Sequence, residues 1–221
     1  PLVAPKAQVT EDNTEAYALK PTWEKVDNAD YYEIEFEGMN YSTIKDTELL
    51  FEGLNVETIY NFKIRAVNKD GQSDWSAFSA TTKRDPLEFA IHGIVGETTA
   101  ANQGRSLRRL FDFEEGELWH TKYNEKAIPF DLIMDLKSIN QVDKFHYLPR
   151  ENAGNGTILK GTVYYSMDKE NWTEAGAFDW KRDNEVKIFT FSQVPTARYI
   201  KMNVTEAVGN YGSGREIYVF K

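Results

Sequence analysis

The chain contains no cysteine, and no apolar stretch approaches the about 20 residues that a membrane-spanning helix requires. Without cysteine there is neither a disulfide framework nor a thiol nucleophile, so packing or a bound metal must hold the fold together. Histidine is scarce as well, since the chain has only His92, His120 and His146, without the i, i+4 spacing of metal ligands. Glycine-rich loops that open a helix are missing too, which excludes the common phosphate-binding motifs.

Positive charge is in short supply. The 221 residues contain 26 lysines and arginines against 35 aspartates and glutamates, giving a net charge of −9. Such a chain repels phosphate backbones and anionic lipids, so neither nucleic acid nor a membrane surface is an expected partner. The charge is also uneven, because −7 falls on residues 1–86 and −2 on residues 87–221. Together with the polar, proline-ended segment 81–86, this asymmetry predicts one domain over 1–86 and a second over 87–221.

Aromatic residues are plentiful, at 14% of the chain, and they favour strands and sandwich cores. Several segments alternate apolar and polar residues with the period of two that a half-buried strand shows. The clearest of these segments are 32–37, 59–67, 130–136 and 161–167. The alternation at 16–23 predicts a further strand with Ala16, Ala18 and Trp23 facing inward. Because helical periodicity is lacking, the chain is predicted to be all-β.

Three motifs in the first part resemble the fibronectin type III family over about residues 4–84. They are Trp23, the segment 54–68 and the turn 71–76. Leu54 and Tyr60 have the spacing of that family's tyrosine corner, in which the tyrosine hydroxyl caps a backbone loop. The resemblance implies an immunoglobulin-like β-sandwich that acts as a spacer. Contact with a partner through Trp75 and Tyr31 is the alternative role.

Five segments in the second part occur together in the discoidin family, also called the coagulation-factor 5/8 type C domain. They are 110–121, 147–150, 166–172, 197–202 and Glu216 with Ile217. The closest resemblance is to family-32 carbohydrate-binding modules and the N-terminal domain of galactose oxidase. It implies an eight-stranded, galactose-binding-like jelly-roll sandwich with ligand loops at one end. Trp119 and Trp172 are expected to be core residues of this sandwich rather than ligand contacts, and Trp180 is expected to be structural as well.

The same resemblance implies one structural Ca²⁺ ion. Its ligands would be side-chain carboxylates and two backbone carbonyls, at Asp112, Glu114, Glu117 and Glu216 and at Arg109 and Arg215. Crowded carboxylates repel each other unless a cation lies between them, and Ca²⁺ takes 6–8 oxygen ligands. Phe113 stands where the family usually has glycine, so the loop is expected to follow a different path. The alternative is an acidic turn that water solvates.

A ligand site is also implied by the resemblance. Arg150, Asn155 and Tyr211 occupy positions that contact sugars in related modules, and His120 and Tyr123 are further candidates. A guanidinium and an amide suit neighbouring sugar hydroxyls, while an aromatic ring suits the C–H face of the sugar. Bracing of the loop is the alternative role of Arg150, and a plain turn is that of Asn155.

These observations predict non-catalytic glycan binding, with galactose-type sugars as the first candidates. Glycoside hydrolysis needs two carboxylates about 5–10 Å apart, and the metal turn accounts for the acidic cluster, so no enzyme activity is expected. The loops 152–157 and 209–214 are rich in Gly, Asn and Ser, which argues against membrane insertion. We expect a secreted, periplasmic or surface protein of a bacterium, with its signal or anchor absent from this chain. The alternative function is a protein-interaction or structural appendage of a larger surface assembly or glycosidase.

Overall fold

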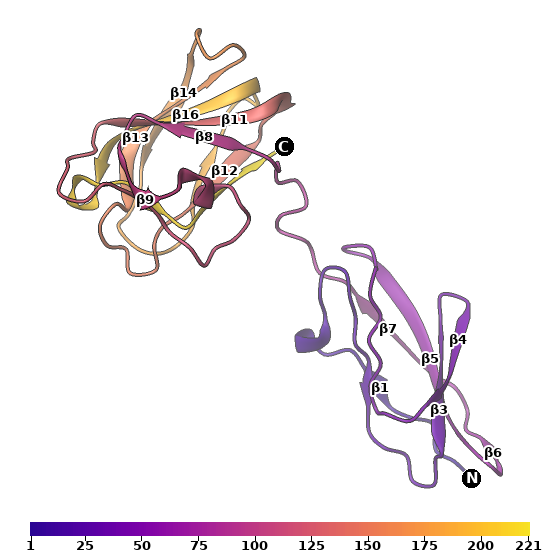
Figure 1. Cartoon of the computed structure of the whole chain (residues 1–221). Coiled ribbons are helices and arrows are strands. Elements are labelled where there is room, and N and C mark those ends of the chain that lie inside the picture. The colour runs from indigo at the N-terminus through magenta and orange to yellow at the C-terminus, as the bar shows by residue number, and fades with distance from the viewer. The chain divides into compact units, whose positions relative to one another are not determined.

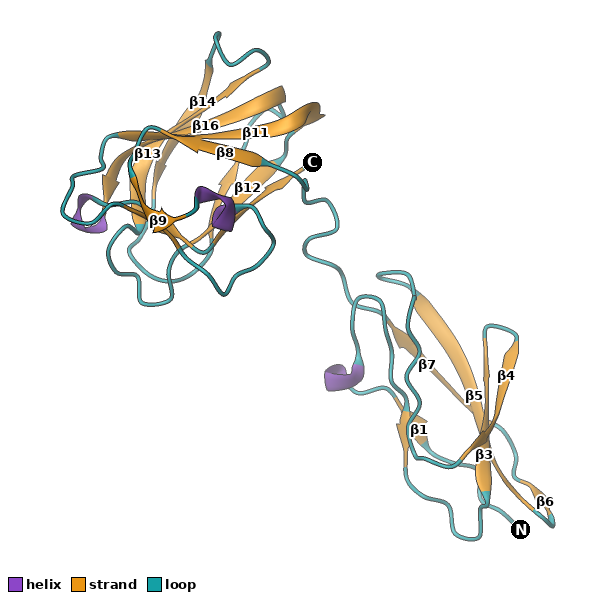
Figure 2. Cartoon of the chain, in the orientation of Figure 1, coloured by secondary structure: helices purple, strands orange, loops and turns teal.

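The structure is a computed structural model that describes residues 1–104 and 106–221 and the backbone of Arg105. The chain forms two compact units, Pro1–Pro86 and Leu87–Lys221, each with a hydrophobic core of its own (Figure 1). Strands dominate both units, and helix is limited to the short 3-10 turns η1 (Glu11–Asn13), η2 (Leu107–Leu110) and η3 (Val208–Asn210) (Figure 2). The predicted all-β class is therefore confirmed. None of the described helices is long and apolar enough to cross a bilayer.

The N-terminal unit is built on antiparallel strands with the predicted alternation. Its strands are β1 (Ala7–Gln8), β2 (Thr22–Trp23), β3 (Tyr31–Phe36), β4 (Met39–Ile44), β5 (Ile59–Asn68), β6 (Gly71–Gln72) and β7 (Ser76–Thr81). One sheet has the order β4-β3-β5-β6 with β7 also paired to β5, and the other pairs β1 with β2. Every second residue of β3 is buried, because successive side chains of a strand point to opposite faces.

The tyrosine corner predicted from the spacing of Leu54 and Tyr60 is present, since the Tyr60 hydroxyl accepts a hydrogen bond of 2.8 Å from the Asn55 amide. The prediction of a strand over residues 16–23 was wrong in its extent. Only Thr22–Trp23 is a strand, and Leu19 rather than an alanine is the fully buried residue of this stretch. The chain there is held mainly by isolated bridges, so a run of alternating small residues did not suffice to make a strand.

The two large sheets of the C-terminal unit contain eight strands, the number expected for the jelly-roll sandwich. A five-stranded sheet has the order β14-β13-β16-β11-β8, and a three-stranded sheet has the order β15-β12-β18. A third, small sheet joins β17, β10 and β9. The strands are β8 (Val95–Thr98), β9 (Asn102–Arg105), β10 (Trp119–Thr121), β11 (Phe130–Gln141), β12 (Lys144–Leu148), β13 (Ile158–Ser166), β14 (Thr173–Asp179), β15 (Lys187–Thr190), β16 (Thr196–Ala207), β17 (Ser213–Gly214) and β18 (Glu216–Phe220).

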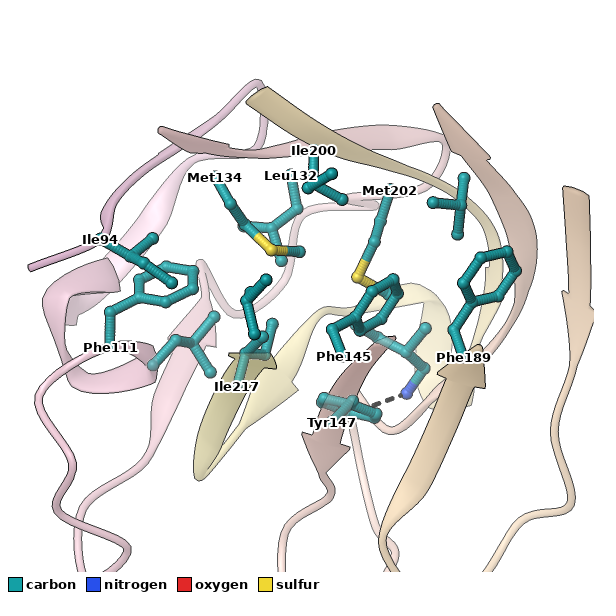
Figure 3. Close-up of a cluster of buried hydrophobic side chains, with 14 of the residues drawn as sticks. Ile94, Phe111, Leu132, Met134, Phe145, Tyr147, Phe189, Ile200, Met202 and Ile217 are labelled. Atoms are coloured by element: carbon teal, nitrogen blue, oxygen red, sulfur yellow. Dashed lines mark hydrogen bonds between the residues drawn. The ribbon is translucent and has the colours of Figure 1, made fainter. Parts of the chain in front are cut away.

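The core of this unit lies between the two large sheets. Figure 3 shows Met134 and Met202 of the five-stranded sheet facing Phe145 and Ile217 of the three-stranded sheet. Trp119 is fully buried in the same cluster and Trp180 packs against it, as expected.

The prediction that Trp172 is a core residue was wrong. Trp172 is half-buried and lies outside the core cluster, and the Lys201 ammonium lies 4.2 Å from the centre of its ring. Lys201 comes from β16, at a position whose neighbours Ile200 and Met202 are fully buried, so it belongs to the outer face of the sheet. The ring is therefore covered by a cation, and its role is to pack on the outside of the sandwich.

Because the cores are separate, we predict that core truncations act on one unit at a time. Leu132→Ala should destabilise the C-terminal unit by about 2–5 kcal/mol, and Ile64→Ala should do the same to the N-terminal unit. Differential scanning calorimetry of the full chain should show one transition shifting while the other stays in place. Equal shifts of both transitions by either substitution would contradict the independence of the cores.

Candidate functional site

Two loops of the C-terminal unit carry three of the five predicted ligand residues, Arg150, Asn155 and Tyr211. The loop 149–157 follows β12, and the segment 208–212 follows β16. Backbone hydrogen bonds join them directly, from Gly156 to Val208 (2.8 Å), from Val208 to Thr157 (2.9 Å) and from Ser213 to Gly156 (2.9 Å). The two loops therefore form one connected surface.

The Asn155 carbonyl is a shared acceptor within this surface. The Arg150 guanidinium donates to it at 3.0 Å, and the Ser213 hydroxyl donates to it at 2.9 Å. Gly156 has φ of 88°, and a Cβ atom there would lie 2.5 Å from Ser213 Oγ, so the close approach of the loops requires glycine. Arg150 therefore braces the loop, as its alternative role predicted, and its side chain is still half exposed.

Aromatic rings gather next to these loops. The His120 ring stacks on Tyr123 with the ring centres 4.2 Å apart, and it lies 5.4 Å from Tyr211. The Tyr123 and Tyr211 rings meet edge to face at 5.8 Å, and the Asn124 amide donates to the Tyr211 hydroxyl at 3.2 Å. We call Tyr123 and Tyr211, with His120 beneath them, the aromatic cluster. Its rings are held in place before any ligand arrives.

Gly209 connects the aromatic cluster to Asn155. A Cβ atom on Gly209 would lie 2.7 Å from Asn155 Oδ1 and 3.1 Å from the Tyr211 ring, so these two side chains border the same glycine. The structure therefore connects all five predicted ligand residues. Asn155 and Tyr211 border Gly209, the rings of Tyr123 and His120 contact Tyr211, and Arg150 is bonded to the Asn155 backbone.

Exposure divides the five residues by role. Asn155 is exposed, Tyr123 is 38% exposed, and Arg150 and Tyr211 are half-buried, so each presents polar atoms or ring surface. His120 is fully buried, and its contribution is to pack under the two tyrosines. The exposed set offers hydrogen-bond donors and acceptors beside apolar ring surface, which suits a ligand with hydroxyls on one side and C–H groups on the other.

Supporting residues that the sequence did not reveal lie around this surface. Gln103 of β9 accepts a hydrogen bond from the Tyr123 amide at 2.8 Å. Arg182 donates to the Ala153 carbonyl and Asn184 to the Glu151 carbonyl, both at 2.9 Å, so the loop after Trp180 braces the loop 149–157. None of these residues belongs to a motif, and only the folded chain brings them to the site.

The candidate metal turn is centred on Glu216. This side chain is fully buried, and its Oε1 accepts a hydrogen bond from the Ile217 amide at 3.3 Å. Within the described part of the chain, its Oε2 has no hydrogen-bond partner. Burial, together with the negative charge of Asp112, raises the pKa of Glu216 to about 8. A buried carboxylate next to a second carboxylate must either take up a proton or face a cation, so Asp112 and Glu216 fit a cation site.

The other predicted metal residues take different positions. The Glu117 side chain is 63% exposed and forms an ion pair of 3.2 Å with the Arg109 guanidinium. Glu114 is exposed, and its backbone amide donates a hydrogen bond to the Asp112 carboxylate. Among the described residues, no three acidic or histidine side chains come together around one point. A cation beside Glu216 would therefore take further oxygens from the backbone, for which the Arg109 and Arg215 carbonyls were the expected donors.

Phe113 occupies the turn in the conformation that glycine favours, with φ of 62°. Its ring stacks on His92 with the ring centres 3.9 Å apart and packs against Tyr218. The packing of a large ring on two neighbours offsets the strain of a left-handed backbone. The backbone at Phe113 therefore keeps the left-handed conformation that glycine would adopt, although a different path was expected here.

Comparison with known families supports the sequence resemblance over both units. The family model of the F5/8 type C domain matches residues 93–217, and that of the fibronectin type III domain matches residues 4–82. Both resemblances inferred from the sequence are confirmed.

Curated proteins and solved structures are similar to this chain over about 60% of its length. An A type blood N-acetyl-alpha-D-galactosamine deacetylase of Flavonifractor plautii is 27% identical over 133 residues, which span 59% of this chain and 16% of the deacetylase. The family 32 carbohydrate-binding module of Clostridium perfringens NanJ in complex with galactose is 26% identical, with a TM-score of 0.56 over 60% of this chain and 98% of the module. The Clostridium perfringens module CpGH89CBM32-5 in complex with GalNAc-β-1,3-galactose is 28% identical, with a TM-score of 0.55 over 60% of this chain and 99% of the module.

The raised pKa of Glu216 predicts a pH dependence of stability in metal-free protein. Between about 4.5, the ordinary carboxyl value, and about 8, the folded chain holds a proton on Glu216 that the unfolded chain has released, so stability falls as the pH rises through this window. Glu216→Gln removes the ionisation. With a chelator present, urea unfolding should show the variant gaining about 2 kcal/mol or more over the unmodified chain between pH 5 and pH 8. A constant difference across this range would contradict the assignment.

Proposed function

The chain belongs to the F5/8 type C domain family, and we propose that its C-terminal unit binds galactose-type glycans without catalysing a reaction on them. The observation that carries the proposal is the convergence of Arg150, Asn155, Tyr123 and Tyr211 on one loop surface. Modules 26% and 28% identical to this chain were solved in complex with galactose and GalNAc-β-1,3-galactose, which supports this ligand class.

The chemistry of recognition follows from the exposed groups. The Arg150 guanidinium and the Asn155 amide supply donors and one acceptor that match vicinal hydroxyls, and the Tyr211 ring offers an apolar platform for the C–H face of a sugar. The loops are tied together by backbone hydrogen bonds, so little conformational entropy is lost on binding. A single shallow surface still binds weakly, and several copies or a partner domain would be needed for strong retention.

Two further observations support binding without catalysis. The exposed ligand residues are arginine, asparagine and tyrosine, which do not provide the pair of carboxylates that glycoside hydrolysis needs about 5–10 Å apart. The chain spans 16% of the deacetylase that it resembles, so that enzyme's activity is not transferred to it.

The cellular setting is inferred from the relatives. The match to part of a deacetylase and to modules of Clostridium perfringens proteins favours a piece of a secreted or surface glycan-handling protein of a bacterium. The fibronectin-like unit would act there as a spacer. The same observation favours the second candidate function, in which the chain is an appendage that joins a glycosidase or a surface assembly through protein contacts.

A structural Ca²⁺ ion beside Glu216 completes the proposal. Support comes from Oε2 of Glu216, which is buried next to Asp112 and has no hydrogen-bond partner among the described residues. The Arg109 and Arg215 carbonyls would supply the backbone oxygens. Such an ion would neutralise the two carboxylates and link the turn 112–117 to β18. Glu114 and Glu117 are left in solvent or paired with Arg109, so the proposed site relies on fewer carboxylates than the sequence suggested.

We predict that Arg150→Ala and Tyr211→Ala each weaken galactose or GalNAc binding about tenfold, because each removes a group that contacts the sugar. Isothermal titration calorimetry measures the affinities. Arg84→Ala, an exposed arginine in the N-terminal unit, and Tyr41→Ala, a tyrosine 38% exposed like Tyr123, are the matched controls and should bind normally. Unchanged affinity in both site variants would remove this surface as the glycan site.

For the metal, we predict that millimolar Ca²⁺ raises the melting temperature of chelator-treated protein and that Glu216→Gln abolishes this shift. The ion stabilises the state that binds it, and the amide lacks the charge that holds it. Thermal melting with Ca²⁺, and with Mg²⁺ for comparison, provides the measurement. If neither Ca²⁺ nor chelator moves the midpoint of the unmodified chain, the site is wrong.

A further inference from the structure

A hollow lies directly beside the proposed ligand surface and shares Arg150 with it. It has a volume of about 320 Å³, at the lower end of the about 300–1,000 Å³ that ligand pockets span. One wall is the turn 115–118 and the other is the turn 150–152, with Arg215 between them. Arg150 therefore belongs both to this hollow and, through its bond to the Asn155 carbonyl, to the ligand surface.

The wall formed by residues 150–152 is fixed in place. The Ala153 amide donates to the Arg150 carbonyl at 3.0 Å, and the Asn152 side-chain oxygen accepts from the Gly154 amide at 2.9 Å. The contacts from Arg182 and Asn184 hold the same turn from outside. The hollow is thus a built feature with a rigid wall.

Most of the charged groups around the hollow are already engaged. Glu115 accepts a hydrogen bond from the Tyr218 hydroxyl at 2.8 Å, Glu117 pairs with Arg109, and Arg215 donates to the Pro149 carbonyl at 2.7 Å. Within the described part of the chain, the Glu151 carboxylate and the Asn152 amide nitrogen make no hydrogen bond to protein. These two groups are left to accept from and donate to hydroxyls, which matches a neutral sugar better than an ionic ligand.

We propose that the hollow is a second sugar subsite, so that the glycan surface takes an oligosaccharide with its second unit between the turns 115–118 and 150–152. This inference rests on the proposed function, because the first unit must occupy the surface formed by Arg150, Asn155 and Tyr211. Arg150 lies where the two units join. Glu151 and Asn152 then determine which linkages are accepted, since they meet only the second unit.

The test compares galactose and GalNAc with a panel of galactose- and GalNAc-terminated disaccharides that differ in linkage, including GalNAc-β-1,3-galactose. Calorimetry on the full chain should show at least one disaccharide binding about fivefold tighter than its terminal monosaccharide, which corresponds to about 1 kcal/mol. Gly116→Trp is designed to fill the hollow, since Gly116 lines it and a Cβ atom there would have no neighbour within 4 Å. It should abolish the disaccharide advantage and leave monosaccharide affinity as it was.

Glu151→Gln is the second variant, and it should reduce the advantage even if Gly116→Trp fails to fold. Glu174→Ala, an exposed glutamate on β14, is the matched control and should keep the advantage. If the monosaccharides bind and every disaccharide binds equally well, or if the advantage survives both variants, the second subsite is wrong while the proposed function stands. If neither monosaccharides nor disaccharides bind, the proposed function itself fails.

Discussion

The Tyr147 hydroxyl is the interaction on which the ligand end of the molecule depends. Its ring is fully buried in the core of the C-terminal unit and stacks on Trp180, while its hydroxyl donates to the Ser213 carbonyl at 2.6 Å and accepts from the Ile158 amide at 3.2 Å. The Tyr147 hydroxyl thus joins β13 and β17, the strands that directly follow the two ligand loops. Burial raises its pKa, so the group stays a neutral donor at any physiological pH. A core residue therefore helps to hold both ligand loops in place.

A chain without cysteine has to stabilise such loops by other means. Here the means are backbone carbonyls that accept several donors, glycines that allow close approach, and a buried carboxylate poised to meet a cation. Glu216 follows Arg215, whose side chain donates to Pro149, so the proposed metal turn and the ligand loops meet at the start of β18.

The sequence predicted those features that depend on local pattern. Alternation located β3 and β5, and the spacing of Leu54 and Tyr60 predicted the tyrosine corner, because both are set by neighbours along the chain. It failed where the outcome depends on distant packing. Trp172 lies outside the core, with the Lys201 ammonium against its ring. Phe113 has a glycine-like backbone, and its ring packs on His92 and Tyr218.

The candidate ligand site shows the same division. Sequence similarity placed five residues in the site, but it carried no information on which of them reach the surface. His120 lies in β10 opposite Ser213, at a position fully enclosed by the small sheet and the rings above it. Its burial follows from the pairing of β10 with β17, two strands separated by more than 90 residues of chain. A ligand surface assembled from such pairings can be recognised only once the sheets have formed.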